Sequence, residues 1–233
     1  MKFDKLIHKK KSSLAVLVDP DKFDKGLIKL LNKSSVKFIL VGGSKLKRNN
    51  LKEIVKAIKK ITKIPVVLFP GDESQLCKEA DGIFILSLLS GRNPEYLIEK
   101  QIRAAQKIKE LKLKTFPVAY ILVDTGSKSQ TQKISKTKPL KDDKKILDTM
   151  LAAEQLGFKA VYLEAGSGSK QQINSALINK ASQTISIPLI VGGGISSALG
   201  AKKAKSSGAN VVVVGNALEK NKHLIHALSK VFV

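Results

Sequence analysis

The chain has 233 residues, of which 43% are hydrophobic and 26% charged, as in soluble globular proteins. Its 42 lysines and arginines against 19 acidic residues give a formal net charge of +23, so an anionic partner is expected. No apolar run approaches the roughly 20 residues of a membrane span, and the single cysteine excludes an internal disulfide. The start of the chain lacks the apolar region of a secretory signal, so we expect a cytoplasmic protein.

The positive charge is nearly all lysine, which argues against a protein that reads nucleic acid. Such proteins rely on arginine and on aromatic side chains, but arginine occurs only as Arg48, Arg92 and Arg103, and aromatic residues are 5% of the chain. We therefore predict no nucleic-acid partner. Most of the lysine excess is attributed to solvated helix faces.

Apolar, β-branched runs alternate with helical periodicity along the chain, which indicates βα units and a parallel sheet. A helix is predicted around Leu51, Ile54, Val55 and Ile58, and another from Tyr96 to Leu111. Eight strands in a chain of this length favour one modified TIM (β/α)8 barrel over residues 1–233, with an open doubly wound sheet as the alternative. The predicted strands are Leu14–Val18, Val36–Val41, Val66–Phe69, Gly82–Leu86, Phe116–Val123, Ala160–Leu163, Leu189–Val191 and Asn210–Val214.

Two connections depart from a regular barrel. Only the segment from Asp72 to Asp81 separates the third and fourth strands, which is too short for a full crossover helix, so the third unit is predicted to be irregular. The segment from Asp124 to Lys141 is long and polar and leaves the carboxyl end of the fifth strand. Long loops on the catalytic face of a barrel are usually active-site covers, so we predict a lid there.

Three successive strands end in glycine. The sixth runs into Gly166-Ser167-Gly168, the seventh into Gly192-Gly193-Gly194, and the eighth into Gly215-Asn216. Glycine lets backbone N–H groups approach a phosphate that a Cβ would keep away. Because the last strands of a (β/α)8 barrel commonly hold a phosphate, these junctions predict one shared phosphate site.

Two acidic residues stand at strand ends where chemistry is expected. Glu164 closes an apolar strand and faces the proposed phosphate loops, with Tyr162 on the same face, although a salt bridge to a lysine is the competing explanation. Asp19 ends the first strand and Ser44 follows the second, where they would hold Mg²⁺ against a diphosphate or merely cap helices. Asp21 is expected to cap the following helix.

The positions of the three histidines argue against catalysis by histidine and against a zinc site. His8, His223 and His226 lie near the termini, away from every predicted strand end, so acid–base chemistry by histidine is not expected. The sequence has no cysteine and histidine cluster typical of zinc sites.

Six motifs together resemble the geranylgeranylglyceryl phosphate synthase family, which includes the PcrB-type enzymes. They occur in the family's order and span nearly the whole chain, and YLEAGSG followed by VGGG and VGN is highly specific. The motifs are VDPDK at 18–22, VGGS at 41–44, ISKTKP at 134–139, YLEAGSG at 162–168, VGGG at 191–194 and VGN at 214–216.

The resemblance implies a modified TIM barrel that joins sn-glycerol 1-phosphate to a prenyl diphosphate in ether-lipid, and hence phospholipid, biosynthesis. It implies Asp19 and Ser44 as ligands of a Mg²⁺ cofactor, and Glu164 as the residue that binds the glycerol hydroxyls and takes a proton. The implied glycerol-phosphate site comprises Tyr162, Leu163, Glu164, Ala165, Gly166, Ser167, Gly168, Gly193, Gly194, Gly215 and Asn216.

Details of the resemblance favour the archaeal-type branch and a geranylgeranyl donor. PcrB-type members have a lysine two residues before the metal aspartate, where this chain has Leu17. We also expect a homo-oligomer and a transient contact with a membrane surface for the lipid substrate and product.

Two other functions stay open at this point. One is a phosphate-binding barrel that acts as an isomerase or aldolase on a phosphorylated small molecule, although no lysine or histidine stands at an inward strand end to serve it. The other is a basic, non-enzymatic protein that binds an anionic surface, with lysines gathered on one face and no need for Mg²⁺.

Overall fold

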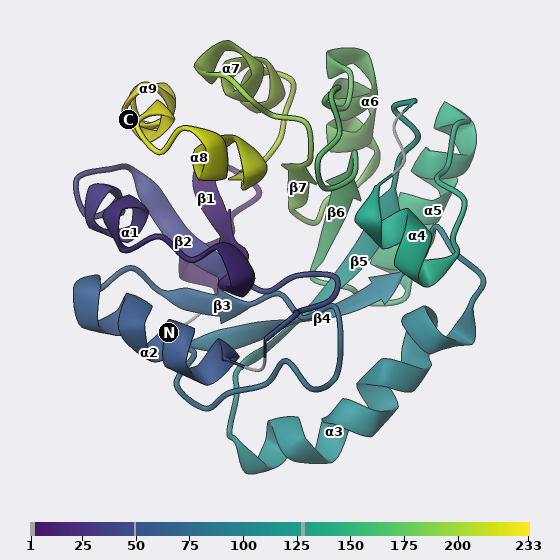
Figure 1. Ribbon diagram of the computed structural model, residues 1–233. Helices are drawn as coiled ribbons and strands as arrows, with labels where there is room; N and C mark the ends of the chain where they lie inside the picture. The colour runs from purple at the N-terminus through teal and green to yellow at the C-terminus, as the bar shows by residue number, and fades with distance from the viewer. Residues whose placement is uncertain (1–2, 49, 127–128) are drawn as a thin grey trace.

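The fold is known from a computed structural model, which describes residues 3–48, 50–126 and 129–233. Eight parallel strands form a closed barrel in sequence order, with β1 pairing β8 to close it (Figure 1). The predicted TIM barrel is therefore confirmed, and the open sheet is wrong. The strands are β1 Ser13–Val18, β2 Val36–Val41, β3 Val66–Leu68, β4 Gly82–Leu88, β5 Thr115–Leu122, β6 Ala160–Glu164, β7 Leu189–Gly192 and β8 Val211–Val214.

Helices surround the barrel and cover its outer face (Figure 1). The predicted helix at Leu51 is α2, and the one predicted from Tyr96 is the π turn η3 continuing into α3. No helix in the described part of the chain is both long and apolar enough to cross a membrane. The helical elements are η1 Phe3–Lys5, η2 Pro20–Lys22, α1 Lys25–Leu31, α2 Leu51–Ile61, η3 Glu95–Glu99, α3 Lys100–Glu110, α4 Gln130–Ser135, α5 Asp143–Gln155, α6 Ser175–Thr184, α7 Ala198–Ser206, α8 Asn216–Lys220 and α9 Leu224–Val231.

Side chains alternate along each strand between the barrel interior and the layer beneath the helices. On β6, Tyr162 belongs to the interior cluster, whereas Val161 and Leu163 pack in the outer layer. The interior is closed at the amino ends of the strands by η1, where the ring of Phe3 stacks 4.7 Å from that of Phe116. A ligand must therefore enter from the carboxyl ends.

The third unit is irregular, as predicted. No helix connects β3 to β4, and β3 is so short that it pairs with β4 only at Gly82 and Ile83. The rest of β4, up to Leu88, extends past β3 without a partner on that side. The barrel wall is thus incomplete near its carboxyl end.

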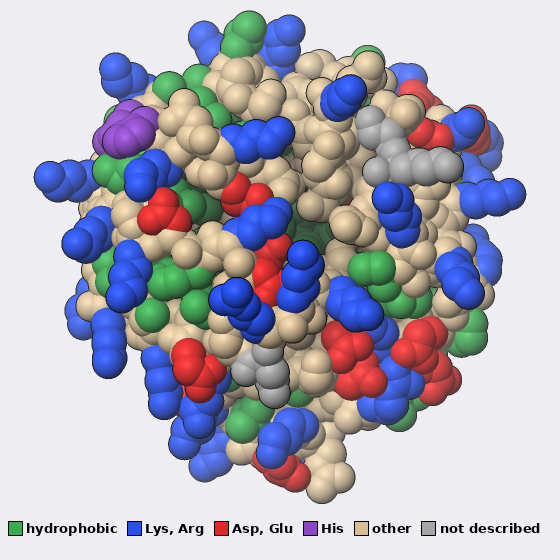
Figure 2. All heavy atoms as spheres, in the orientation of Figure 1, with side chains coloured by type: hydrophobic (Ala, Val, Ile, Leu, Met, Phe, Trp, Pro, Cys, Tyr) green, Lys and Arg blue, Asp and Glu red, His purple; other side chains and the backbone are tan. Residues whose placement is uncertain are grey.

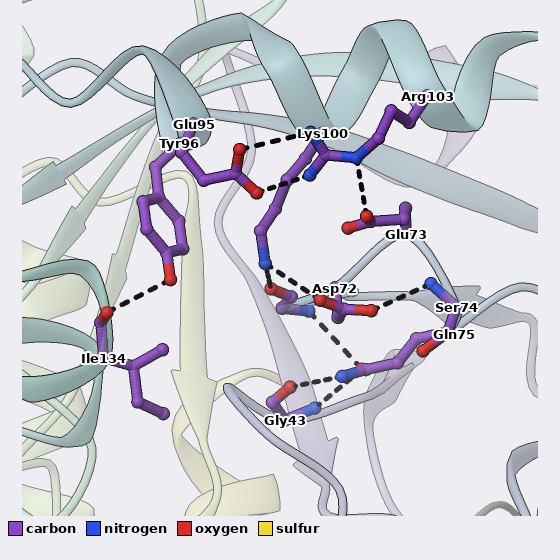
Figure 3. A network of polar contacts seen from close by, with 11 residues as sticks. Gly43, Asp72, Glu73, Ser74, Gln75, Glu95, Tyr96, Lys100, Arg103 and Ile134 are labelled. Atoms are coloured by element: carbon purple, nitrogen blue, oxygen red, sulfur yellow. Dashed lines mark hydrogen bonds and ion pairs between the residues drawn. The ribbon is translucent and has the colours of Figure 1, made fainter.

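A network of polar contacts holds the helix-free connection in place (Figure 3). Gln75 Nε2 donates to the Gly43 carbonyl at 2.8 Å, and Gln75 Oε1 accepts from the Gly43 and Gly71 N–H groups at 3.3 and 3.4 Å. Lys100 reaches back from α3 to the Gly71 carbonyl at 2.8 Å and to the Asp72 carboxylate at 3.0 Å. These bonds replace the support that a crossover helix would give.

The segment predicted as a lid differs from a simple loop. It contains the short helix α4, which Ser129 caps by accepting from the Gln132 N–H at 3.1 Å. Ser129, Ser135 and Thr137 are buried polar residues, so the segment is packed onto the barrel rim. Positions 127 and 128 of the predicted lid lie outside the described residues.

Candidate active site

One cavity at the carboxyl ends of the strands brings most of the predicted residues together. Figure 2 shows the hollow near the middle of this face, with acidic and basic side chains around it. The predicted residues that line the cavity are Asp19, Ser44, Tyr162, Glu164, Ser167, Gly168, Gly193, Gly194, Gly215 and Asn216. No histidine lines it among the residues that the structure describes.

Glu164 is the buried charge at the centre of this cavity. Glu164 is the last residue of β6 and is only 5% exposed. Oε1 accepts a hydrogen bond from the Gly166 N–H at 2.6 Å, and the hydroxyls of Tyr162 and Tyr120 face the carboxylate as further donors. Burial raises the pKa of Glu164 to about 7, against the opposing effect of these three donors. Near neutral pH this carboxyl can therefore both take and release a proton.

The carboxylate of Glu164 fits because Gly193 has no side chain. A Cβ on Gly193 would overlap Glu164 Oε1, and Gly193 also adopts a left-handed φ of +81°. Gly192, one residue earlier, gives the same clearance to the Tyr162 hydroxyl. These glycines thus make room for Glu164 and Tyr162, a role that the sequence pattern alone did not distinguish from phosphate binding.

Asn216 joins two of the glycine loops. Its Oδ1 accepts from the Gly168 N–H at 3.1 Å and from the Ser167 hydroxyl at 3.2 Å. The loop after β6 is therefore tied to the start of α8, next to Gly215. Such a ring of loop backbone and small polar side chains suits a phosphate.

Three predicted binding residues do not face the cavity. The side chain of Leu163 is fully buried in the outer layer, and Ala165 is buried beside it. Gly166 is also enclosed, because a Cβ there would lie 2.5 Å from Ser129 Cβ. For these positions only the backbone is available to the site, and the Gly166 N–H already serves Glu164.

Asp19 and Ser44 follow the carboxyl ends of the neighbouring strands β1 and β2, as predicted. Asp19 Oδ1 is 3.7 Å from the position that a Cβ on Gly43 would occupy, so the carboxylate sits beside the loop that carries Ser44. Asp19 accepts from the Asp21 N–H at 3.0 Å, and burial is the main cause that raises its pKa. The Lys22 ammonium is 3.9 Å away.

The expected capping role of Asp21 was wrong. Asp19 caps η2 and Asp24 caps α1, whereas Asp21 accepts from the backbone N–H groups of Lys47 and Arg48 at 2.7 and 3.2 Å. Asp21 therefore fixes the connection after β2. A capping residue and a bridge between two loops look alike in sequence, because both place an aspartate after a strand.

A second, mainly apolar cavity adjoins the first. It runs from Ser44 and Phe69 through the incomplete wall beside β4 to the inner face of α3, where Ala104 and Ile108 line it. The two cavities share Gly43, Ser44, Phe69, Tyr120, Thr131 and Ile134. They therefore adjoin each other at the barrel mouth.

Tyr120 and Thr131 are site residues that the sequence reasoning missed. Tyr120 lies opposite Tyr162 in the register of β5 and β6, so the period of two along the predicted fifth strand was an available signal. Thr131 comes from α4, and its side chain meets the site only because that helix packs over the cavity. No local pattern in the sequence marks it.

Comparisons with known proteins agree with this geometry. The sequence profile of the PcrB family matches residues 6–232. The chain is 44% identical over 217 residues to geranylgeranylglyceryl phosphate synthase of Flavobacterium johnsoniae, covering 90% of this chain and 89% of that protein. It is 37% identical to the Pyrococcus furiosus protein of the same name, with 94% and 90% covered.

A solved structure is also similar. It is (S)-3-O-geranylgeranylglyceryl phosphate synthase from Thermoplasma acidophilum in complex with its substrate sn-glycerol-1-phosphate. The TM-score is 0.90 at 30% sequence identity, and the match covers 96% of this chain and 94% of that one.

The buried carboxyl of Glu164 predicts a specific dependence of stability on pH. Its pKa is about 7 in the folded protein and lower once the chain unfolds. As pH rises, the carboxyl therefore stays protonated to a higher pH in the folded state than in the unfolded state. Its contribution to stability should therefore fall between about pH 4.5 and pH 7, by about 3 kcal/mol in total. Glu164→Gln removes this loss, so the variant should gain stability relative to the wild type as pH rises.

Urea unfolding at about pH 5 and pH 8 measures this difference. Glu110→Gln, on the exposed face of α3, controls for the change in net charge. A difference between wild type and Glu164→Gln that stays constant over this range would show that Glu164 titrates as an exposed carboxyl does.

Proposed function

This chain belongs to the PcrB family, and we propose that it transfers a geranylgeranyl group from geranylgeranyl diphosphate to sn-glycerol 1-phosphate. The products are an ether-linked prenylglyceryl phosphate and diphosphate. The names of the relatives from Flavobacterium johnsoniae and Pyrococcus furiosus and the substrate of the Thermoplasma acidophilum protein support this activity.

The adjacency of the polar and apolar cavities, which share lining residues, is the observation that carries the proposal. A transferase of this kind must hold a small phosphorylated alcohol and a long hydrocarbon side by side, with the reacting atoms where the two compartments meet. The residues shared by both cavities, including Ser44, Tyr120 and Thr131, mark that meeting point. An isomerase or aldolase of a small sugar phosphate has no use for the apolar compartment.

Glu164 supplies the acceptor half of the reaction. The glycine loops hold the phosphate, which places the glycerol hydroxyls toward Glu164 and the two tyrosines. The attacking hydroxyl oxygen bonds to the first carbon of the prenyl group while the bond from that carbon to the diphosphate oxygen breaks. The hydroxyl proton goes to Glu164, and the bonding pair leaves with the diphosphate.

Asp19 and Ser44 suit the donor half with Mg²⁺. No group of three or more histidine, cysteine or acidic side chains that could hold a metal occurs in the described ranges. Magnesium, however, is usually held by one or two carboxylates together with substrate phosphates and water, so Asp19 with the Ser44 hydroxyl fits this pattern. When bound, the ion would neutralise charge on the leaving diphosphate. Lys22, Lys45 and Lys47 line the same cavity and add positive charge.

The apolar cavity is the proposed site of the prenyl tail. Burial of hydrocarbon there contributes roughly 0.8 kcal/mol per CH₂ group, so a long tail would be bound firmly. The cavity follows the gap left by the short β3, where no crossover helix fills the space. Assignment to the archaeal-type branch, a homo-oligomeric state, a transient membrane contact and a cytoplasmic location stay predictions from the sequence.

A basic surface binder is less well supported. Figure 2 shows lysine and arginine side chains around the whole outline of this face, which does not resemble a single docking patch. Several of these lysines are paired, as Lys22 is with Glu219 at 2.8 Å.

The direct test is an assay with labelled sn-glycerol 1-phosphate and geranylgeranyl diphosphate. We expect a labelled product that extracts into organic solvent. In Glu164→Gln, kcat should fall about 100-fold or more, because the amide cannot take the proton. Absence of product from the wild-type protein, with Mg²⁺ and both substrates saturating, would refute the proposed function.

Asp19→Asn tests the donor half. The amide keeps the bond to the Asp21 N–H and hence the local fold, but it removes the negative charge that attracts Mg²⁺. We expect the Mg²⁺ concentration for half-maximal rate to rise about tenfold or more. Chelation of Mg²⁺ should abolish activity in both proteins. Asp24→Asn, which alters an aspartate on the neighbouring helix, serves as the control, and an equal Mg²⁺ requirement in all three proteins would contradict the assignment.

Ala104→Phe tests the tail site. The added ring would fill the part of the apolar cavity against α3, so kcat/KM for geranylgeranyl diphosphate should fall about tenfold or more relative to a shorter prenyl diphosphate. Ala105→Phe is the matched control, because Ala105 is the exposed neighbour on the same helix. Equal preference for long and short donors in the two variants would place the tail elsewhere.

A further inference from the structure

Thr131 stands between the two halves of the site. Its Oγ1 is 3.4 Å from the Ser44 Oγ, and its hydroxyl also lies close to the hydroxyl of Tyr120. The Tyr120 hydroxyl in turn faces the Glu164 carboxylate. The side chains of Ser44, Thr131, Tyr120 and Glu164 therefore form one chain of contacts across the barrel mouth, from β2 to β6.

When Glu164 is ionised, the number of protons available sets the direction of the contacts in this chain. The carboxylate can then only accept, so the single proton of the Tyr120 hydroxyl is directed to Glu164 and the Tyr120 oxygen accepts from Thr131. Thr131 then has no proton for Ser44, and it can only accept from the Ser44 hydroxyl. The lone pairs of Ser44 are thereby left facing the cavity, where a cation or a donor group would use them.

The position of Thr131 depends on how α4 is seated. The Tyr96 hydroxyl donates to the Ile134 carbonyl at 3.1 Å (Figure 3), and Asn93 Nδ2 approaches the Ser135 carbonyl at 3.5 Å. At the start of the helix, Ser129 packs against Gly166, next to the loop that bonds Glu164. A displaced α4 would remove Thr131 from both Ser44 and Tyr120.

We propose that Thr131 is a positioning residue that orients Ser44 and Tyr120 together, so that the donor and acceptor halves are set only when α4 covers the cavity. This inference rests on the proposed prenyl transfer. Thr131 touches neither reacting atom. It directs the Ser44 lone pairs into the cavity and keeps the Tyr120 hydroxyl pointing its proton at the Glu164 carboxylate. Hydrogen bonds in such a chain polarise one another, so loss of the central hydroxyl weakens both ends.

Thr131→Val keeps the shape of the side chain and removes the hydroxyl. We expect kcat for prenyl transfer to fall about tenfold or more, as for a lost hydrogen bond in a buried charged network, with KM for both substrates within about threefold of wild type. Thr131→Ser restores the hydroxyl and should recover most of the rate. Thr149→Val is the matched control, because the Thr149 hydroxyl only bonds the Lys145 carbonyl of its own helix.

A double-mutant cycle with Tyr120→Phe separates this role from a general loss of packing. Because Thr131 acts in part through Tyr120, the loss of rate in the doubly substituted protein should be smaller than the product of the two single losses. The same cycle measured by urea unfolding needs no metal and no substrate, and the losses of the two single variants should again fail to add. Thr131→Ala replaces Thr131→Val if the latter does not fold.

The outcomes are distinct for the two proposals. A wild-type protein without transferase activity refutes the proposed function, and the unfolding cycle then still decides the role of Thr131. An active wild type with an equally fast Thr131→Val overturns the present inference. A slow Thr131→Ser, or losses that add fully in both cycles, overturns it as well, because the hydroxyl would then have no special role.

Discussion

The burial of the Glu164 carboxylate is the constraint on which the site depends. A carboxylate removed from water needs hydrogen-bond donors, and here the Gly166 N–H, Tyr120 and Tyr162 supply them. Each donor requires its own backbone arrangement: a turn directly after β6, paired tyrosines on β5 and β6, and a β7 end without a Cβ at Gly193. The conflict between burial and hydrogen bonding leaves a carboxyl whose pKa lies close to neutral pH.

The second feature that shapes the molecule is the incomplete barrel wall. The three residues of β3 cannot pair with the whole of β4, and no helix connects the two strands. An apolar cavity occupies the space, while Gln75 and Lys100 secure the chain that would otherwise be unsupported (Figure 3). A regular eightfold barrel would have a sealed wall here and no passage between the polar mouth and the inner face of α3.

These two features meet at α4. The helix covers the mouth, contributes Thr131 and Ile134 to both cavities, and rests on Ser129 packed against Gly166. A segment that was predicted as a lid is thus a folded part of the site wall in this structure. Its polar residues are buried because they bond backbone and side-chain groups of the rim, as Ser135 does with the Thr131 carbonyl.

The sequence by itself determined eight βα units and a parallel sheet, because β-branched runs alternate with helical periodicity along the chain, whereas the pairing of β1 with β8 decided that the sheet closes. The sequence also placed Asp19, Ser44 and Glu164 at strand ends, since parallel strands bring their carboxyl ends to one rim. Only the tertiary structure decided that Asp21 braces Lys47 and Arg48, that Leu163 faces away from the site, and that Thr131 reaches Tyr120. These side-chain placements depend on how segments far apart in the sequence pack together, and no local sequence pattern predicts such contacts.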